Sequence, residues 1–388
     1  MDSSLKLKNI NTNYSRKERK ITFPLIYEKP KPETYLGGGV FGKLYRMTCK
    51  NDKQEYAVKQ IDIKEVQITL TLIKGRPTSK QQTLDFILNE SINLAKLNHV
   101  NIVRYYSTTH FEKKVFISLE LMKGGTLEDA IISKRFYNNP IQMAIVLAQI
   151  ASGVSYLHDN NLLHRDIKAN NILLSNDKKP IVKLGDFGMS YLLTENQYYQ
   201  QTKKENGAGH MFYRSPESIS GEKYGRADDN WAVGIISLEL MSNLILSSCV
   251  SNKHFAQYAN LNEYVDQITT DFCSAVNSEN IVFSLFKKMS IAKVTKNLLN
   301  NKSLNRMTAK EMLIELNKNN NIVLTDWKSR IKSNSYTYKR PSSPNNTEMI
   351  TTSLRPHSSC SAVRPTYHGR KFKISSMKNL PCQKPDTC

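Results

Sequence analysis

His164-Arg165-Asp166-Ile167-Lys168-Ala169-Asn170-Asn171 is the stretch that carries most of the chemical information in this chain. An aspartate two residues before a lysine and five before an asparagine places a proton acceptor, a cation and a metal-binding amide on one loop. Further along, Asp186 stands between a Leu-Gly and a Phe-Gly and supplies a second oxygen of the kind that Mg²⁺ prefers. The two strings together are typical of a site that handles phosphate and magnesium.

A glycine-rich string lies upstream, at Gly37-Gly38-Gly39-Val40-Phe41-Gly42. Its glycines let the backbone approach phosphates closely, where a Cβ atom would obstruct the contact. Dinucleotide-binding folds use the same glycine spacing, but in them a helix and an acidic residue follow. Here Lys43-Leu44-Tyr45 continues as a strand and leads to Ala57-Val58-Lys59. The downstream pattern therefore indicates a glycine hairpin followed by a strand that carries a lysine.

In this order and spacing, the three strings resemble those of eukaryotic-type protein kinases over roughly residues 33–323. The resemblance implies an α+β, bilobal fold, with a small β-rich N-lobe that includes helix C (33–121) and a larger, mainly helical C-lobe (122–323). It also implies an ATP-dependent enzyme that transfers the γ-phosphoryl group of Mg-ATP to hydroxyls of a protein substrate.

The resemblance gives each residue of the catalytic loop a role. Asp166 would accept the proton of the substrate hydroxyl or orient that hydroxyl, and Lys168 would neutralise the γ-phosphate. Asn171 and Asp186 would be the two metal ligands for Mg²⁺.

The residues that would hold ATP come from the N-lobe and the hinge between the lobes. Lys59 would bind the α- and β-phosphates, with Glu90 as the carboxylate that holds it in place. Glu65 and Asp85 are nearby competitors, but they lack the pattern that follows Glu90. The other expected ATP-binding residues are the loop glycines, the residues around adenine and the hinge: Gly37, Gly39, Gly42, Leu44, Ala57, Glu120, Met122 and Leu173.

Lys168, two residues after Asp166, favours the serine/threonine class, with sterile-kinase-like and NIMA-related kinases as the most similar subgroups. One position departs from the family pattern. Serine/threonine kinases usually carry threonine seven residues before the glutamate of Ser215-Pro216-Glu217, and this chain has His210 there. We expect His210 to change substrate preference or pH dependence. Arg165 is expected to receive an activation-loop phosphate, with Thr202 as the first acceptor and Thr194, Tyr198 and Tyr199 as alternatives.

Hydrophobic periodicity predicts strands from Tyr35 to Ile61 and again over 102–107 and 115–121, with a helix that ends near Asn98 between them. A long amphipathic helix is predicted over 141–160. Residues 62–85 are longer than a strand-to-helix connection needs, and their Thr/Ile/Leu run suggests an inserted strand-like flap.

The formal charge of +21 is concentrated near the two ends of the chain. Residues 1–32 hold eight Lys/Arg against three acids, and residues 324–388 hold twelve against three. We therefore expect a basic disordered arm (1–32) and a basic Ser/Thr/Pro-containing disordered tail (324–388) around the kinase domain. Such tails are expected to bind nucleic acid or anionic membranes weakly and in a salt-sensitive manner.

No early stretch has the features of a secretory signal, and the apolar run Trp231–Val250 fits a buried kinase helix better than a membrane span. The six cysteines form no zinc or redox motif. An enzyme that uses cellular ATP is expected to be intracellular, in the cytoplasm or the nucleus.

Three other interpretations stay open. A pseudokinase or scaffold with a kinase fold would explain His210 and the insertion. A dual-specificity kinase would share the catalytic residues. A third interpretation makes nucleic-acid or lipid binding by the tails the main activity, although no dedicated binding module is visible.

Overall fold

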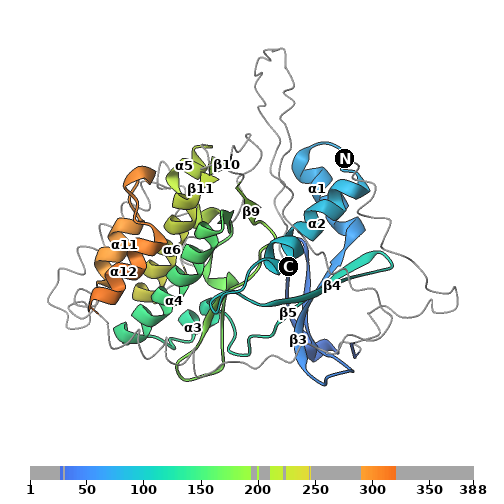
Figure 1. Ribbon diagram of the computed structural model, residues 1–388, viewed down its shortest axis with the longest axis horizontal. Coiled ribbons are helices and arrows are strands. Elements are labelled where there is room, and N and C mark those ends of the chain that lie inside the picture. The colour runs from blue at the N-terminus through green and yellow to red at the C-terminus, as the bar shows by residue number, and fades with distance from the viewer. Residues whose placement is uncertain are drawn as a thin grey trace, which may run out of the picture. The chain divides into compact units, whose positions relative to one another are not determined.

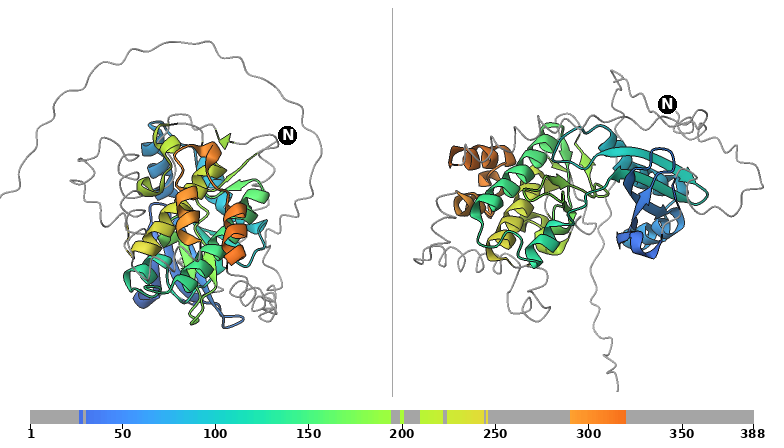
Figure 2. Two further views of the ribbon diagram at one scale, coloured as in Figure 1. Left: turned by 90° about the vertical axis from the view of Figure 1, so that its left-hand side faces the viewer. Right: turned by 90° about the horizontal axis from the view of Figure 1, so that it is seen from below.

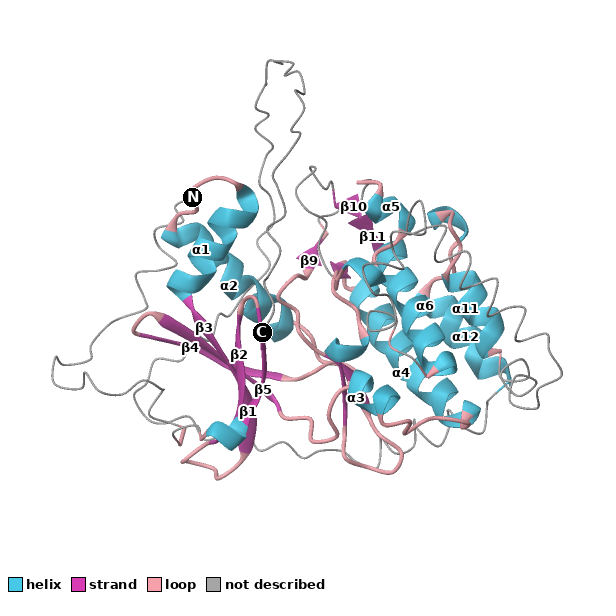
Figure 3. Cartoon of the chain, turned by 180° about the vertical axis from the view of Figure 1, so that it is seen from behind, coloured by secondary structure: helices cyan, strands magenta, loops and turns pink. Residues whose placement is uncertain are grey.

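The computed structural model describes residues 27–28, 31–193, 199–200, 210–221, 224–243, 245 and 290–319. Strands gather with helices in the N-terminal part, and helices with short two-stranded sheets make up the part that follows (Figure 3). This is the bilobal α+β arrangement that the sequence predicts.

The N-lobe is built on one antiparallel sheet with the strand order β1-β2-β3-β5-β4, of which β3, β4 and β5 are labelled in Figure 1. Its β3 pairs with β2 on one side and β5 on the other, which places Ala57 opposite Leu119 and Lys59 opposite Leu44 and Ile117. The strands are β1 (Tyr35–Gly39), β2 (Gly42–Thr48), β3 (Glu55–Asp62), β4 (Tyr105–Phe111) and β5 (Lys114–Glu120).

The predicted flap in residues 62–85 is wrong, because the chain forms a helix there, α1 (Ile63–Lys74). Asp62 caps its first turn by accepting hydrogen bonds from the backbone of residues 64 and 65, and Gly75 ends it in the left-handed conformation. Ile63, Val66 and Leu70 share one face and are buried. That apolar face and the two caps outweigh the β-branched run that suggested a strand.

Helix C is α2 (Lys80–Ala95), which begins at a capping box formed by Ser79 and Gln82. It ends three residues before the predicted Asn98. Leu84, Ile87 and Leu94 face the core, and the buried Glu90 lies between them on the helix.

Tyr27 extends the N-lobe into the predicted N-terminal arm. Its backbone forms a β-bridge with Cys49, and its side chain is buried and hydrogen-bonds the hydroxyl of Ser118 at 2.5 Å. It packs against Tyr56 in a small aromatic cluster beside β3. Tyr27 is therefore part of the folded lobe. Residues 1–26 of the predicted arm and the tail 324–388 lie outside the described residues.

The C-lobe is organised around two helices whose central residues are buried on all sides. Every residue from Met143 to Ala151 of α4 and from Asp228 to Met241 of α6 is buried. In both views of Figure 2 the orange helices α11 and α12 run alongside them, and α11 contacts α6 while α12 contacts α4. The helices are α3 (Leu127–Ile132), α4 (Pro140–Asp159), α5 (Pro216–Ile219), α6 (Arg226–Ser242), α11 (Ile291–Leu298) and α12 (Ala309–Asn319).

Burial on all sides makes α4 less amphipathic than the sequence predicts. It is also the helix, among the described residues, whose length and composition would allow it to cross a membrane, yet 72% of that apolar window is buried inside the protein. The core helix of a folded domain has this composition. The described part of the chain therefore offers no clear transmembrane segment, and α6 is the buried C-lobe helix that was expected.

Short two-stranded antiparallel sheets complete the C-lobe, and single 3₁₀ turns occur in both lobes. The two-stranded sheets pair β6 with β9, β7 with β8, and β10 with β11. The strands are β6 (Leu162–Leu163), β7 (Ile172–Leu174), β8 (Val182–Leu184), β9 (Tyr191–Leu192), β10 (Tyr199–Gln200) and β11 (Tyr224–Gly225). The 3₁₀ turns are η2 (Pro32–Thr34), η3 (Ala169–Asn171), η4 (Met211–Tyr213) and η5 (Ser303–Asn305).

Candidate active site

Lys59 of β3 joins the two lobes at the site. Its Nζ donates to Glu90 Oε2 on α2 at 2.8 Å and to Asp186 Oδ1 after β8 at 2.9 Å. In the sequence, Glu90 and Asp186 follow Lys59 by 31 and 127 positions, respectively. The structure thus brings together the predicted phosphate-binding lysine, its carboxylate partner and the predicted metal ligand.

The charges of this triad are strongly coupled. Burial disfavours the charged form of Lys59, but Glu90 and Asp186 outweigh it and raise the pKa of the lysine. Lys59 lowers the pKa of Asp186 to about 2 against the opposing effect of burial. Burial, with help from Asp186, raises the pKa of Glu90 although Lys59 opposes the change. Asp186 is therefore ionised at neutral pH, as a magnesium ligand must be.

The glycine loop is the hairpin between β1 and β2, with Gly39 opposite Gly42. Gly42 adopts φ 157°, and a Cβ on it would lie 2.8 Å from the carbonyl oxygen of Gln60. Gly37, at φ 146°, and Gly39 have open space where a Cβ would stand. At the tip, Phe41 packs on Phe86 of α2, with ring centroids 5.0 Å apart. This contact, which the sequence did not predict, links the loop to helix C.

The side chains predicted to surround adenine are apolar and come from both lobes. Ala57 is buried in the main core, and Leu44 from β2 and Leu173 from β7 pack against that core. At the hinge, Glu120 donates its backbone N–H to the carbonyl of Arg104, and its carboxylate lies 3.0 Å from Lys183 Nζ. Met122 follows β5 at the predicted hinge position.

Three residues hold Asp166 in place, two from the catalytic loop and one from the segment before Ser215. Lys168 Nζ donates to its Oδ2 at 2.9 Å, and Asn171 Nδ2 donates to the same oxygen and to the backbone carbonyl, both at 2.8 Å. The backbone N–H of His210 donates to Oδ1 at 3.1 Å. The side chain of Asp166 is 10% exposed, so its carboxylate is both fixed and reachable.

Asp229, buried at the start of α6, fixes the backbone of this loop. Its carboxylate accepts from the N–H groups of His164 and Arg165, each at 3.0 Å, and from His158 and the hydroxyl of Tyr224, each at 2.9 Å. Burial opposes ionisation, but the hydrogen bond and charge of His158 lead the interactions that lower the pKa of Asp229.

Two residues of the site have left-handed backbone conformations, which are unfavourable for residues other than glycine. Arg165 has φ 69° and Asp186 has φ 54°. Each such conformation costs roughly 1–3 kcal/mol and persists where the surroundings fix it. In this chain the fixing groups are Asp229 for Arg165 and Lys59 for Asp186.

The oxygen donors available near the nucleotide position fit magnesium. Within the described residues, both side-chain hydrogen bonds of Asn171 use Nδ2, which leaves its amide oxygen for a metal. Asp186 uses Oδ1 toward Lys59, which leaves Oδ2. The described part of the chain has no cluster of three His, Cys, Asp or Glu that could hold a metal alone. Two protein oxygens completed by phosphates and water are the usual environment of Mg²⁺.

Comparison with known proteins agrees with this geometry. Residues 31–315 match the protein kinase domain family. The chain belongs to the protein kinase family. Among its relatives, calcium-dependent protein kinase 4 of Plasmodium falciparum is 33% identical over 268 residues, which is 68% of this chain and 44% of the relative.

Two further relatives match over a shorter stretch of the chain. Calcium/calmodulin-dependent protein kinase type 1 of Caenorhabditis elegans is 34% identical over 218 residues, covering 56% of this chain and 57% of the relative. Mouse serine/threonine-protein kinase Nek9 is 36% identical over 214 residues, 54% of this chain and 20% of the relative. The chain thus spans about half the length, or less, of these relatives. They identify a kinase domain of the serine/threonine class, while the subgroup stays a prediction.

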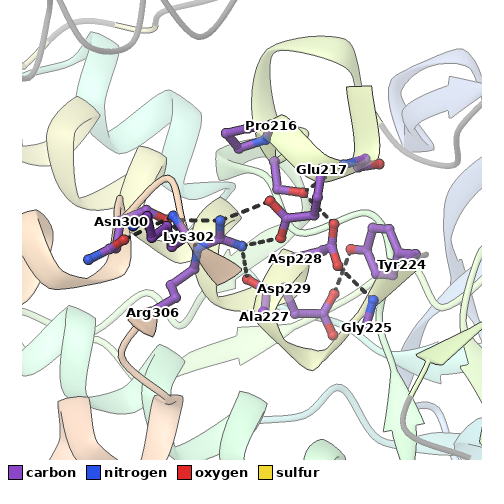
Figure 4. Close-up of polar contacts among 12 residues, drawn as sticks. Pro216, Glu217, Tyr224, Gly225, Ala227, Asp228, Asp229, Asn300, Lys302 and Arg306 are labelled. Carbon is purple, nitrogen blue, oxygen red and sulfur yellow. Dashed lines mark hydrogen bonds and ion pairs between the residues drawn. The ribbon is translucent and has the colours of Figure 1, made fainter. Parts of the chain in front are cut away.

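The activation segment of this kinase is anchored by an ion pair between Glu217 and Arg306 (Figure 4). Both guanidinium ends contact the carboxylate, and Arg306 Nη2 reaches Glu217 Oε2 at 2.9 Å. Arg306 also donates to the carbonyls of Ala227 and Asn300 and lies 4.9 Å from the ring centroid of Trp231. The pair fixes the end of the segment against α6.

His210, the residue that departs from the family pattern, contacts Asp166 through its backbone. The backbone N–H, not the imidazole, contacts Asp166. The ring lies against Phe212 and Tyr213, with centroids 5.6 and 5.8 Å away. Thr194, Tyr198 and Thr202, the expected phosphate acceptors, lie outside the described residues, as does the side chain of Tyr199. The catalytic contact at residue 210 is therefore independent of its side chain.

Proposed function

We propose that this chain transfers the γ-phosphoryl group of Mg-ATP to serine or threonine hydroxyls of protein substrates. The observation that carries the proposal is the convergence of Lys59, Glu90 and Asp186 beside a glycine hairpin, with Asp166 held separately on the catalytic loop. ATP use and the serine/threonine choice rest on these residues and on the family.

The chain's own residues would divide the reaction between the lobes. Asp166 holds the substrate hydroxyl, whose oxygen forms the new bond to the γ-phosphorus while its proton passes toward the Asp166 carboxylate and ADP leaves. Lys168 lies 2.9 Å from Asp166 and would neutralise the charge on the transferred group. Lys59 would hold the remaining phosphates. Asn171 and Asp186 would hold Mg²⁺, which supplies charge neutralisation on the phosphates when bound.

A peptide array with radiolabelled ATP tests activity and residue choice together. We expect Mg²⁺-dependent labelling of serine or threonine peptides that disappears in Asp166→Ala. Labelling of tyrosine peptides at a comparable rate would replace the proposal with a dual-specificity kinase. Stoichiometric nucleotide binding without labelling of any peptide would replace it with a scaffold.

The basic ends of the chain suggest that the enzyme also binds polyanions weakly, and ATP use suggests an intracellular location in the cytoplasm or the nucleus. The eight and twelve Lys/Arg of residues 1–32 and 324–388 support the first part. We expect full-length protein to bind duplex DNA or phosphatidylserine vesicles at low salt and to lose that binding as salt rises. Binding that is unaffected by salt would contradict an electrostatic role.

A further inference from the structure

A short turn follows the metal-binding aspartate and is closed by Ser190. The Ser190 hydroxyl donates to the carbonyl oxygen of Phe187 at 2.6 Å, and its backbone N–H donates to the same oxygen at 3.0 Å. Ser190 is 3% exposed, and Phe187 is fully buried. The backbone that leaves Asp186 is therefore folded back on itself inside the protein.

Helix α2 sends two asparagine side chains into this turn. Asn93 Nδ2 donates to the Ser190 hydroxyl oxygen at 2.9 Å, and Asn89 Nδ2 donates to the Ser190 carbonyl oxygen at 3.0 Å. Residues four apart on a helix share one face, so both amides point to the same turn. Glu90, which holds Lys59, is the neighbour of Asn89 on that helix. The turn and the ion pair are thus attached to the same part of α2.

We propose that Asn93 and Asn89 are positioning residues that bind the Asp186 turn to helix α2 through Ser190. These contacts fix the position of Asp186, the magnesium ligand, relative to Glu90 on the same helix. The inference rests on the proposed kinase function and adds a structural requirement for its metal site. Nothing in the chain's motifs assigns a role to these asparagines.

The physical need for this second attachment comes from Lys59. Lys59 holds Glu90 and Asp186 at once, but a lysine that binds nucleotide phosphates must direct part of its charge to them. The Asn93–Ser190 contact is uncharged and buried, so nucleotide binding leaves it intact. Asp186 also has a left-handed backbone, which must be fixed from outside. The asparagine contacts keep it fixed while Lys59 turns to the phosphates.

Ser190→Ala is the sharpest test because it removes only the hydroxyl and leaves the turn's backbone bond. We expect the Mg²⁺ concentration for half-maximal binding of a fluorescent ADP analogue to rise about tenfold, while binding without Mg²⁺ is unchanged. We expect kcat to fall about tenfold as well. Ser190→Thr, which keeps the hydroxyl, should restore both values toward those of wild type.

Asn93→Ala should give the same pattern, and the double variant Asn93→Ala/Ser190→Ala should be no worse than Ser190→Ala alone, because Ser190→Ala already removes the contact that Asn93 makes. Asn317→Ala is the matched control: its amide donates to the Leu313 carbonyl within α12, away from the site. The control should bind Mg-nucleotide like wild type. Thermal unfolding establishes that each variant is folded, and Ser190→Ala decides the matter if Asn93→Ala does not fold.

The inference is overturned if Ser190→Ala leaves Mg²⁺-dependent binding unchanged, if binding weakens equally with and without Mg²⁺, or if adding Asn93→Ala to Ser190→Ala weakens binding further. The binding measurement needs no phosphoryl transfer. A wild-type protein that binds Mg-nucleotide but labels no peptide would therefore refute the proposed function while the role of Asn93 was still decided.

Discussion

Two buried ion pairs, Lys59–Glu90 in the N-lobe and Glu217–Arg306 in the C-lobe, differ in how completely their polar atoms are satisfied. Arg306 contacts both oxygens of Glu217, two backbone carbonyls and the face of Trp231. Glu90 has one oxygen on Lys59, and its other oxygen is buried without a hydrogen-bond partner in the described structure. Lys59 itself is shared with Asp186.

The difference separates a structural pair from a functional one. A saturated buried pair has no capacity for a ligand, and removal of one partner leaves an uncompensated charge. An incompletely satisfied pair costs stability as it stands, and such groups are rare in folded proteins unless they serve a purpose. In the described structure Lys59 donates to Glu90 and Asp186, and an ammonium has three N–H donors, so one is available for a phosphate.

Lys59→Met is expected to produce the largest effect, on activity. We expect kcat/KM to fall about 10³-fold, or about 4 kcal/mol of barrier, because a charge on the phosphates is lost. Stability should change by only about 1 kcal/mol, because burial already raises the pKa of Glu90 and the freed carboxyl can take a proton. Initial rates and urea unfolding measure the two quantities. A variant that is mainly unfolded would show that the Lys59–Glu90 pair is structural, like the Glu217–Arg306 pair.

Arg306→Met is expected to have the opposite profile. Loss of the guanidinium leaves the buried Glu217 unpaired, so we expect the free energy of unfolding to fall by about 3 kcal/mol. The folded fraction should keep nearly normal activity. Urea unfolding measures the loss, with exposed Lys302, four residues earlier, changed to methionine as the control. An Arg306→Met protein as stable as that control would show that the C-lobe pair contributes no net stability.

The residues of the candidate site are easier to predict from the sequence than the residues that hold them in place. Asp166, Lys168 and Asn171 lie within six residues, so their mutual contacts follow from one loop, and Lys59 and Asp186 are recognised by their flanking residues. Helix α1 was missed because its β-branched run obscures the buried face of Ile63, Val66 and Leu70. The contact between Asn93 and Ser190 joins positions 97 residues apart, and no local pattern predicts it.

Tyr27 shows the same limit at the edge of the domain. It lies in a stretch whose composition favours disorder, yet one buried aromatic ring and one hydrogen bond to Ser118 attach it to the sheet. Composition averages over a segment, whereas packing is decided by a single side chain that fits. Residues that act through long-range packing are therefore found only in the folded structure.

A smaller effect, on the pH dependence of stability, sharpens the description of the C-lobe anchor. Asp228 is buried beside Glu217 and Arg306, accepts from the Ser215 hydroxyl, and accepts from the backbone N–H of Gly225 at 2.6 Å. Burial raises its pKa to about 7 although these hydrogen bonds oppose the change. The folded protein therefore holds a proton on Asp228 that the unfolded chain releases above about pH 4.

Stability should consequently fall as pH rises from about 4 to about 7, by on the order of 2 kcal/mol, because the unfolded state binds fewer protons in that window. Asp228→Asn mimics the neutral acid and should remove this part of the pH dependence. Urea unfolding of both proteins across the window gives the difference. Parallel curves would mean that Asp228 is ionised throughout and that the anchor tolerates a further buried charge.

The smallest expected effect is at His210, which lies between the two regions and touches Asp166 only through its backbone. Burial, with Lys168 and Arg214, lowers the pKa of His210, so its ring is neutral at pH 7. His210→Thr keeps the backbone contact and should change kcat less than about threefold at neutral pH. At acidic pH, below the lowered pKa of His210, wild type gains a positive charge beside Lys168 and should lose rate faster than the variant. Profiles of kcat against pH on one peptide measure this.

A large loss of kcat at neutral pH would show that the imidazole itself supports Asp166. Identical pH profiles and peptide preference would show that histidine in place of threonine has no effect on the reaction.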